Sequence, residues 1–232
     1  MVKPLFCLKR MRFLSRFMRF FFHHFYHSFA WTYNWVASVV SIGRWNDWIQ
    51  TTVPYIQGTN ILEIGHGPGY LQPILRDMGM AVIGLDESMQ MIRMAKRRLE
   101  KANYKAIHLV RGHAQTLPFP DAKFDSVIST FPSEYIFDPN TPADIYRVLR
   151  DNGRFIVLPA AWIVGRKILD RAAAWLAQVT GETPKNIVEI VVERFIRPLE
   201  QAGFKVESRQ IEARSSIVLI LIASKELDAT RS

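Results

Sequence analysis

Residues 61–71 read ILEIGHGPGYL and are the most informative stretch of the chain. The apolar run at its start predicts a buried strand, and its last two residues predict the start of a helix. Three glycines, Gly65, Gly67 and Gly69, stand at alternate positions between the two. Where side chains are missing, a ligand can approach the backbone amides at the start of a helix. The spacing is GxGxG, which differs from the GxGxxG spacing of dinucleotide-binding proteins.

Short β-rich runs and amphipathic segments alternate around this motif, which predicts an α/β protein with a mainly parallel sheet. The expected strands are Asn60–Ile64, Ala81–Leu85, Ile107–Val110, Ser126–Thr130, Arg154–Leu158, Lys205–Glu212 and Ile217–Ala223. The expected helices are Tyr70–Met78, Ser88–Lys101 with Ser88 as its cap, Ala143–Leu149, Trp162–Gln178 and Lys185–Ala202. A turn at Asp151-Asn152-Gly153 is expected before the fifth strand.

The length of 232 residues, with 49% hydrophobic and 22% charged residues, is enough for one substantial core. This composition excludes a disordered, collagenous or disulfide-stapled chain. The single cysteine, Cys7, cannot form an internal disulfide, and no Cys/His cluster has zinc-ligand spacing. A reducing compartment and the absence of a structural metal are therefore expected.

The net charge of +9 is concentrated at the N-terminus. Residues 1–46 hold seven Lys/Arg and no acid, whereas the remainder holds 23 Lys/Arg and 21 Asp/Glu. A basic and aromatic arm of this kind is typical of proteins that bind nucleic acid or an anionic membrane surface.

The arm itself is expected to be an amphipathic helix over residues 9–25. Its basic sector holds Lys9, Arg12, Arg16 and Arg19, and its apolar sector holds Met11, Leu14, Phe17, Met18, Phe21, Phe22 and Phe25. This composition favours a helix lying in the membrane interface. Two alternatives stay open: the aromatic side chains cover the core or mediate self-association, or the arm is a mitochondrial-type transit peptide.

Two further stretches are expected at the same edge of the sheet as the glycine turn. Asp86 ends the second expected strand, 21 residues after Gly65, where a carboxylate can accept both hydroxyls of a ribose. Asp86 can also cap the helix that follows. Residues 112–121, GHAQTLPFPD, supply another loop at this edge.

Taken together, the three stretches resemble the class I S-adenosylmethionine-dependent methyltransferases over about residues 58–224. The resemblance implies a Rossmann-like seven-stranded sheet with helices on both faces and an antiparallel last strand, and S-adenosyl-L-methionine as the cofactor. It assigns to cofactor binding Glu63, Gly65, Gly67, Gly69, Asp86, Glu87, His113, Ala114 and Thr130.

At His113 the chain departs from this family, which usually has Asp there. A carboxylate accepts a hydrogen bond from the adenine amino group, and neutral imidazole does so only through its unprotonated nitrogen. Either the cofactor binds less tightly, or a backbone contact from Ala114 suffices.

A narrower resemblance lies upstream, in residues 30–34 (AWTYN) and 41–48 (SIGRWNDW). They look like the first segment of the ubiquinone/menaquinone C-methyltransferases and related lipid methyltransferases, although Asn34 replaces an acid. The alternative is a core-packing helix that covers the cofactor.

The substrate side is expected after the fourth strand, in residues 129–135 (STFPSEY). Amino-group methyltransferases often carry Asn/Asp-Pro-Pro-aromatic there, whereas Phe131-Pro132 offers no amide or carboxylate for an amine. A sulfonium methyl is a good electrophile, so positioning and water exclusion are the protein's main tasks. The expected substrate residues are Tyr33, Trp45, Phe131, Tyr135 and Trp162, and Glu134, Tyr135 and His113 are candidate bases or ordinary loop residues.

The expected organisation is a basic arm over 1–28, a helical segment over 29–57 that covers the cofactor, a methyltransferase domain over 58–226 and a tail over 227–232. A helical insertion at about 159–183 is expected either as an apolar lid over a lipid substrate or as a helix packed on the sheet.

These features predict an S-adenosylmethionine-dependent methyltransferase that acts at a membrane surface on a hydrophobic acceptor, quinone-like or a phospholipid. The alternatives are an enzyme for a soluble metabolite or RNA, and a catalytically silent fold used as a binding module. We expect a cytoplasmic protein, peripheral at the membrane, with residues 9–25 on the anionic membrane surface. Nucleic acid is the less favoured partner.

Overall fold

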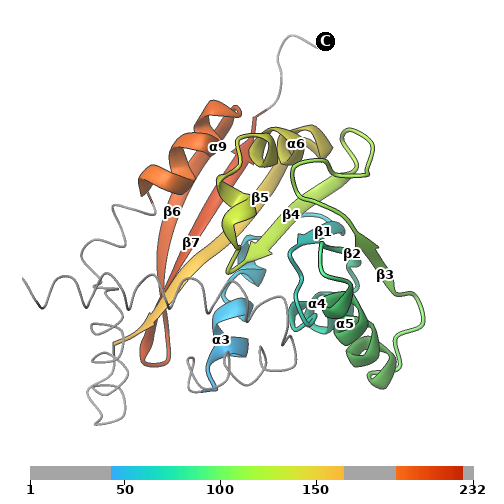
Figure 1. Ribbon diagram of the computed structural model, residues 1–232. Coiled ribbons are helices and arrows are strands. Elements are labelled where there is room, and N and C mark those ends of the chain that lie inside the picture. Colours follow the sequence, from blue (N-terminus) through green and yellow to red (C-terminus); the bar gives the residue numbers. More distant parts are fainter. Residues whose placement is uncertain (1–42, 165–191, 227–232) are drawn as a thin grey trace, which may run out of the picture.

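The computed structural model of the protein describes residues 43–164 and 192–226 (Figure 1). They form a seven-stranded sheet in the order β3-β2-β1-β4-β5-β7-β6. The strands are β1 (Asn60–Ile64), β2 (Ala81–Asp86), β3 (His108–Arg111), β4 (Phe124–Thr130), β5 (Leu149–Ile163), β6 (Phe204–Ala213) and β7 (Ser216–Lys225). The helices are α3 (Trp45–Gln50), η1 (Val53–Tyr55), α4 (Leu71–Asp77), α5 (Met89–Lys101), η2 (Glu134–Phe137), α6 (Asn140–Val148), η3 (Val192–Ile196) and α9 (Arg197–Gln201).

The first five strands are parallel, and β7 is antiparallel to both β5 and β6. The chain passes from β1 to β2 on one side and returns to β4 on the other, so the strand order reverses beside β1. In open α/β sheets a ligand binds outside the carboxyl ends of the strands at such a switch point. The expected sheet, with its antiparallel last strand, is confirmed.

Helices cover both faces of the sheet. On one face, Ile61 of β1 packs with Trp48 and Ile49 of α3 and with α4. On the other face, Leu62 of β1 packs in the cluster that includes α6 and α9. Because side chains alternate along a strand, neighbouring apolar residues of β1 enter different cores. The apolar run of β7 is buried for the same reason.

The helix expected from Trp162 is wrong at its start. Trp162 and Ile163 continue β5, opposite Ile217 and Ser216 of β7. Pairing with a strand more than fifty residues later decides this stretch, and local periodicity does not reveal such a partner. The rest of that helix, over residues 165–178, lies outside the described residues, as do the arm, Tyr33 and the tail.

The turn expected at residues 151–153 is present, but it is a bulge inside β5. Leu149 lies opposite Phe124, and the next paired residue, Arg154, lies opposite Ser126. Asn152 adopts a φ of +61°, a left-handed conformation that Asn tolerates better than most residues. The fifth strand therefore begins at Leu149, five residues earlier than expected.

The remaining elements agree with the expected ones to within a few residues. Of the helix expected over residues 185–202, the described part is helical, with a π-helical turn before α9. Ser88 caps α5, and its hydroxyl accepts a hydrogen bond from the Met91 amide at 3.4 Å. No helix within residues 43–164 and 192–226 is long and apolar enough to cross a membrane.

Candidate functional site

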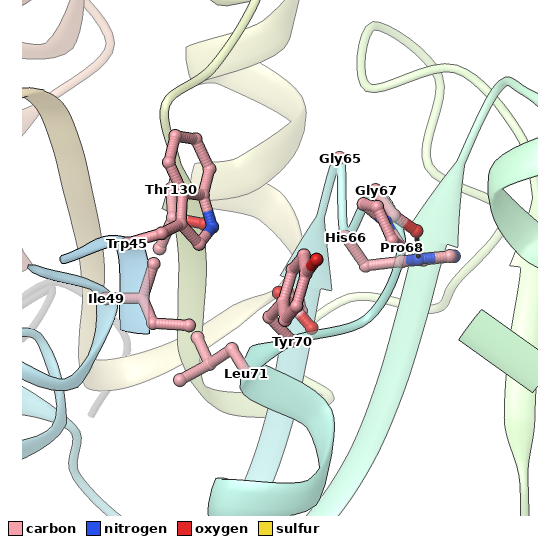
Figure 2. Close-up of a pocket in the computed structure, with 10 residues that line it drawn as sticks. Trp45, Ile49, Gly65, His66, Gly67, Pro68, Tyr70, Leu71 and Thr130 are labelled. Atoms are coloured by element: carbon pink, nitrogen blue, oxygen red, sulfur yellow. Dashed lines mark hydrogen bonds between the residues drawn. The ribbon is translucent and has the colours of Figure 1, made fainter. Parts of the chain in front are cut away.

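A pocket lies beside the glycine turn, outside the carboxyl ends of β1 and β4 (Figure 2). Figure 2 shows Trp45 and Ile49 on one side, the glycine turn on the other, and Tyr70 between them. The lining residues are Trp45, Ile49, Glu63, Gly65, His66, Gly67, Pro68, Tyr70, Leu71 and Thr130.

The turn needs its glycines for two different reasons. Gly65, Gly67 and Gly69 have φ angles of +64°, +53° and +73°, a region that L side chains rarely adopt. A Cβ on Gly65 would lie 2.6 Å from the Tyr135 hydroxyl, and one on Gly69 would lie 2.8 Å from the Ala95 Cβ. A Cβ on Gly67 would meet nothing within 4 Å. The turn is therefore closely packed at its two ends and open at its centre.

Arg98 of α5 holds the turn in place. Its Nη1 donates to the Pro68 carbonyl at 3.0 Å, and its guanidinium lies 3.7 Å from the centroid of the Tyr70 ring. A guanidinium over a tyrosine ring is favoured by the charge distribution of the ring. These two contacts fix both the backbone and the aromatic side chain at one side of the pocket.

Asp86 ties the turn to the second strand. It is 7% exposed, its Oδ2 accepts from the Gly67 amide at 2.9 Å, and its Oδ1 accepts from the Ser88 amide at 2.9 Å. Each carboxylate oxygen has more than one lone pair, so both oxygens can still accept from ligand hydroxyls. The two roles considered for Asp86 are compatible: it accepts from the backbone at the start of α5 and retains acceptor capacity beside the glycine turn.

Glu63 is a buried carboxyl group that lines the pocket. It is 1% exposed, and Gln72 Nε2 donates to its Oε2 at 2.6 Å. Burial raises the pKa of Glu63 to about 8, and the charge of Asp86 adds to the increase, whereas the Gln72 hydrogen bond and Arg76 oppose it. Glu63 is therefore protonated and neutral at pH 7.

This pKa predicts how stability depends on pH. The unfolded chain releases the Glu63 proton above pH 4.5, but the folded chain keeps it up to about pH 8. The contribution of Glu63 to the free energy of unfolding is therefore fully present below pH 4.5. It falls as the pH rises from 4.5, and the loss is complete once the pH has passed about 8. Glu63→Gln removes this loss, so we expect the variant to gain a few kcal/mol over the wild type between pH 5 and about 9. Urea unfolding at several pH values measures it, and parallel profiles would exclude the effect.

His66 contributes an acceptor nitrogen at the pocket. It is 4% exposed, and its Nδ1 lies 2.7 Å from the Gly67 carbonyl, so Nδ1 carries the proton. Burial lowers the pKa of His66, although the charge of Asp86 opposes this change, and the ring is neutral. Its Nε2 is buried and has no hydrogen-bond partner among the described residues.

The loop at His113 meets the end of β2, as expected from the sequence. The Gly112 amide donates to the Asp86 carbonyl at 3.2 Å, and Ala114 is buried. His113 Nδ1 lies 3.4 Å from Glu87 Oε2, and both side chains are largely exposed. The acid absent at position 113 is thus replaced by a histidine with a carboxylate next to it.

An aromatic cluster lies at the α3 side of the pocket. The Phe131 ring stacks on Trp45, with centroids 4.4 Å apart and planes at 30°, and lies 6.1 Å from Trp48. Phe131 has a φ of +50°, which is strained for a bulky side chain. The neighbouring Thr130 lines the pocket. Backbone strain at the end of β4 thus accompanies the packing of Phe131 against α3.

The Tyr135 side chain packs against the glycine turn at Gly65. Its hydroxyl lies 2.6 Å from the Ser129 hydroxyl and donates to the Ile64 carbonyl at 3.3 Å. Burial raises the pKa of Tyr135 above its ordinary value, which makes it a poor base at neutral pH.

The structure separates the other candidates from the pocket. Glu134 is exposed in η2, and Trp162 packs against the core from β5 without lining the pocket.

Sequence reasoning missed several residues that shape the pocket. His66, Pro68 and Tyr70 belong to the glycine motif, but only the glycines received roles. These residues directly follow a buried strand, at the end of the sheet where ligands bind. Their position in the sequence could therefore have indicated that they line the pocket. Ile49 and Arg98 come from elements distant in sequence, and no local pattern distinguishes them.

Comparisons with known proteins agree with this geometry. Residues 62–157 match a family described as a methyltransferase domain. The chain is 37% identical over 133 residues to the demethylmenaquinone methyltransferase of Symbiobacterium thermophilum, covering 53% of this chain and 52% of the relative. It is 30% identical over 141 residues to that of Thermobifida fusca, covering 59% of each. The chain thus spans about half the length of the curated relatives it matches.

Solved structures share the fold. A candidate S-adenosyl-L-methionine-dependent methyltransferase from Methanococcus maripaludis has a TM-score of 0.63 at 21% identity, covering 86% of this chain and 93% of its own. Phosphoethanolamine N-methyltransferase 2 of Haemonchus contortus, in complex with S-adenosyl-L-methionine, has a TM-score of 0.54 at 16% identity, covering 80% and 53%. Residues 62–157 thus match a methyltransferase domain, the chain is similar in sequence to demethylmenaquinone methyltransferases, and it shares the fold of solved methyltransferases.

Proposed function

We propose that the protein transfers a methyl group from S-adenosyl-L-methionine to a hydrophobic, quinone-like acceptor at a membrane surface. The observation that carries the proposal is the pocket, where the open glycine turn, whose Gly67 amide donates to Asp86, lies opposite an aromatic cluster. One side of the pocket offers backbone groups and the Glu63 carboxyl group, and the other offers apolar rings. This division suits a polar cofactor beside an apolar acceptor.

The residues on the polar side fit the cofactor. The turn is open at Gly67, Asp86 keeps acceptor capacity for ribose hydroxyls, and the loop at His113 and Ala114 lies at the end of β2, where the adenine would bind. When bound, S-adenosyl-L-methionine supplies an electrophilic methyl on its sulfonium. In this assignment Glu63 and the glycine turn hold the methionine portion of the cofactor. Glu87, after β2, and Thr130, at the end of β4, flank the cofactor site.

The chain's own contribution to the reaction is positioning and water exclusion. Trp45 and Ile49 close the α3 side, and Phe131 supports Trp45 by stacking on it. A planar ring can align with these aromatic faces at low cost in conformational freedom. Glu63 is neutral at pH 7 and Tyr135 has a raised pKa, so neither removes a proton from the acceptor at neutral pH.

A quinone-like acceptor is favoured over a phospholipid head group for two reasons. The sequence relatives are named demethylmenaquinone methyltransferases. In addition, Phe131-Pro132, directly after β4, offers no amide or carboxylate to orient an amine.

The test is transfer of radiolabelled methyl from S-adenosyl-L-methionine by the purified protein into a total extract of its host. The extract is then separated into lipid, RNA and small polar fractions. We expect label in the lipid fraction, comigrating with a quinone. Label only in RNA or polar material would contradict the acceptor, and no label in any fraction would contradict methyl transfer.

We further infer that residues 9–25 lie on the membrane surface. Deleting residues 1–24 removes six Lys/Arg and most of the apolar sector. We expect binding to anionic liposomes to weaken at least about tenfold, because each basic residue near such a surface contributes about 1 kcal/mol. Liposome flotation measures the change, and unaltered binding would show that the arm has another role.

A further inference from the structure

Positive charge gathers on one helix and the strand after it. Residues 89–111, which cover α5 and β3, contain seven Lys/Arg and a single acid, Glu100. The other described residues contain 12 Lys/Arg and 16 Asp/Glu. The described part of the chain is therefore polarised, with its cations at the β3 edge of the sheet (Figure 1). This polarisation does not depend on the N-terminal arm.

The helix itself separates apolar from basic residues. Met91, Ala95 and Leu99 are buried against the protein, at four-residue spacing. Arg93, Arg97 and Lys101 are exposed at the same spacing. Residues spaced by four lie on neighbouring turns, so the three cations form a row about 12 Å long on the outer side of α5.

The same row begins with an exposed apolar residue. Met89 precedes Arg93 by one turn and is 41% exposed. We refer to Met89, Arg93, Arg97 and Lys101 together as the α5 face.

The cations of the α5 face are not neutralised within the described residues. No acidic side chain of residues 43–164 and 192–226 lies within 4 Å of Arg93, Arg97 or Lys101. The neighbouring Lys96 does pair with Glu100, at 3.8 Å. At the opposite end of the sheet, three cations are paired with acids: Arg197 with Glu193, Lys205 with Glu226 and Arg209 with Glu207.

We propose that the α5 face binds an anionic phospholipid surface, and this proposal rests on the proposed membrane-bound acceptor. A row of cations that no acid of the described residues pairs is complementary to anionic head groups. An exposed methionine at its end can enter the interface without leaving a polar group unpaired. Single-stranded nucleic acid would require aromatic rings for base stacking, and the α5 face contains none.

The α5 face also has a direct connection to the pocket. Arg98 belongs to the same helix and binds the Pro68 carbonyl and the Tyr70 ring. The residues proposed to contact the membrane and the residue that holds the glycine turn thus belong to the same helix, α5. We expect the α5 face to orient the pocket relative to the lipid surface.

The experiment compares two triple variants of the full chain in flotation assays. One carries Arg93→Gln, Arg97→Gln and Lys101→Gln. The matched control carries Arg197→Gln, Lys205→Gln and Arg209→Gln, which removes the same charge from the paired cations. Vesicles contain phosphatidylcholine, with or without about one third phosphatidylglycerol.

We expect the α5 variant to bind the anionic vesicles on the order of 10- to 100-fold more weakly than the wild type, and the control within about twofold. Equal weakening in both variants would overturn the proposal, because net charge alone would then explain binding. Wild-type binding that ignores phosphatidylglycerol would overturn it as well. So would loss of RNA binding in the α5 variant with vesicle binding unchanged.

A second readout separates this proposal from the proposed function. Methyl transfer to a short-chain, water-soluble quinone needs no membrane. If the α5 variant keeps this activity and loses vesicle binding, both proposals are supported. If the wild type shows charge-dependent vesicle binding but no methyl transfer, the proposed function fails and the docking surface stands.

Discussion

Replacing Asp86 with alanine is expected to lower the affinity for S-adenosyl-L-methionine on the order of 100-fold. The substitution removes the acceptor for the ribose hydroxyls and leaves the Gly67 and Ser88 amides without their partner. Hydrogen bonds to a charged group are among the stronger hydrogen bonds. The loss of the two bonds from the ribose hydroxyls therefore accounts for a decrease in affinity on the order of 100-fold. Equilibrium dialysis with labelled cofactor measures the affinity directly.

Asp125→Ala is the matched control for this prediction. Asp125 also accepts from backbone amides, those of Thr59 at 3.0 Å and Asn60 at 2.9 Å, but it does so at the start of β1. We expect this variant to lose stability and to keep its cofactor affinity. Equal affinity losses in both variants would mean that Asp86 acts through the fold and not through the ligand.

Gly65→Ala is expected to destabilise the protein by about 2–4 kcal/mol and to abolish cofactor binding. Part of the cost arises because alanine is strained at a φ of +64°. The rest arises because the new Cβ would lie 2.6 Å from the Tyr135 hydroxyl, which is held by Ser129. Urea unfolding gives the loss in stability.

Gly67→Ala separates these two causes. Its φ of +53° imposes a similar backbone strain, but its Cβ would meet nothing within 4 Å. We expect a loss of about 1–2 kcal/mol, and no rescue by a second substitution. Tyr135→Phe removes the atom nearest to the Gly65 Cβ and is expected to restore part of the stability of Gly65→Ala. Equal destabilisation at both glycines would contradict the contact with Tyr135.

The fold was predictable where the sequence pattern is local. β1 has its expected bounds because an apolar run ends at the glycine turn, and α5 begins at its Ser88 cap. The predicted bounds of β5 were wrong, because pairing with strands distant in sequence determines where this strand begins and ends. Trp162 and Ile163 extend β5 because β7 lies beside them, and the bulge at Asn152 is set by the register with β4.

The site was predictable where residue type and spacing limit the chemistry. Left-handed backbone conformations require the glycines, and the end of β2 places Asp86 beside them. The roles of His66 and Arg98 depend on side-chain directions within the folded chain. The same is true of Tyr135, a candidate base from the sequence, whose hydroxyl lies against Gly65 in a partly buried position.

Calorimetric titration of the purified wild-type chain with S-adenosyl-L-methionine tests the central claim most directly. We predict saturable binding of one cofactor per chain, with a Kd between about 1 μM and 1 mM, and binding on the order of 100-fold weaker in Asp86→Ala. The absence of binding by the folded wild type, or equal binding by the variant, would contradict the assignment of the glycine-turn pocket as the cofactor site.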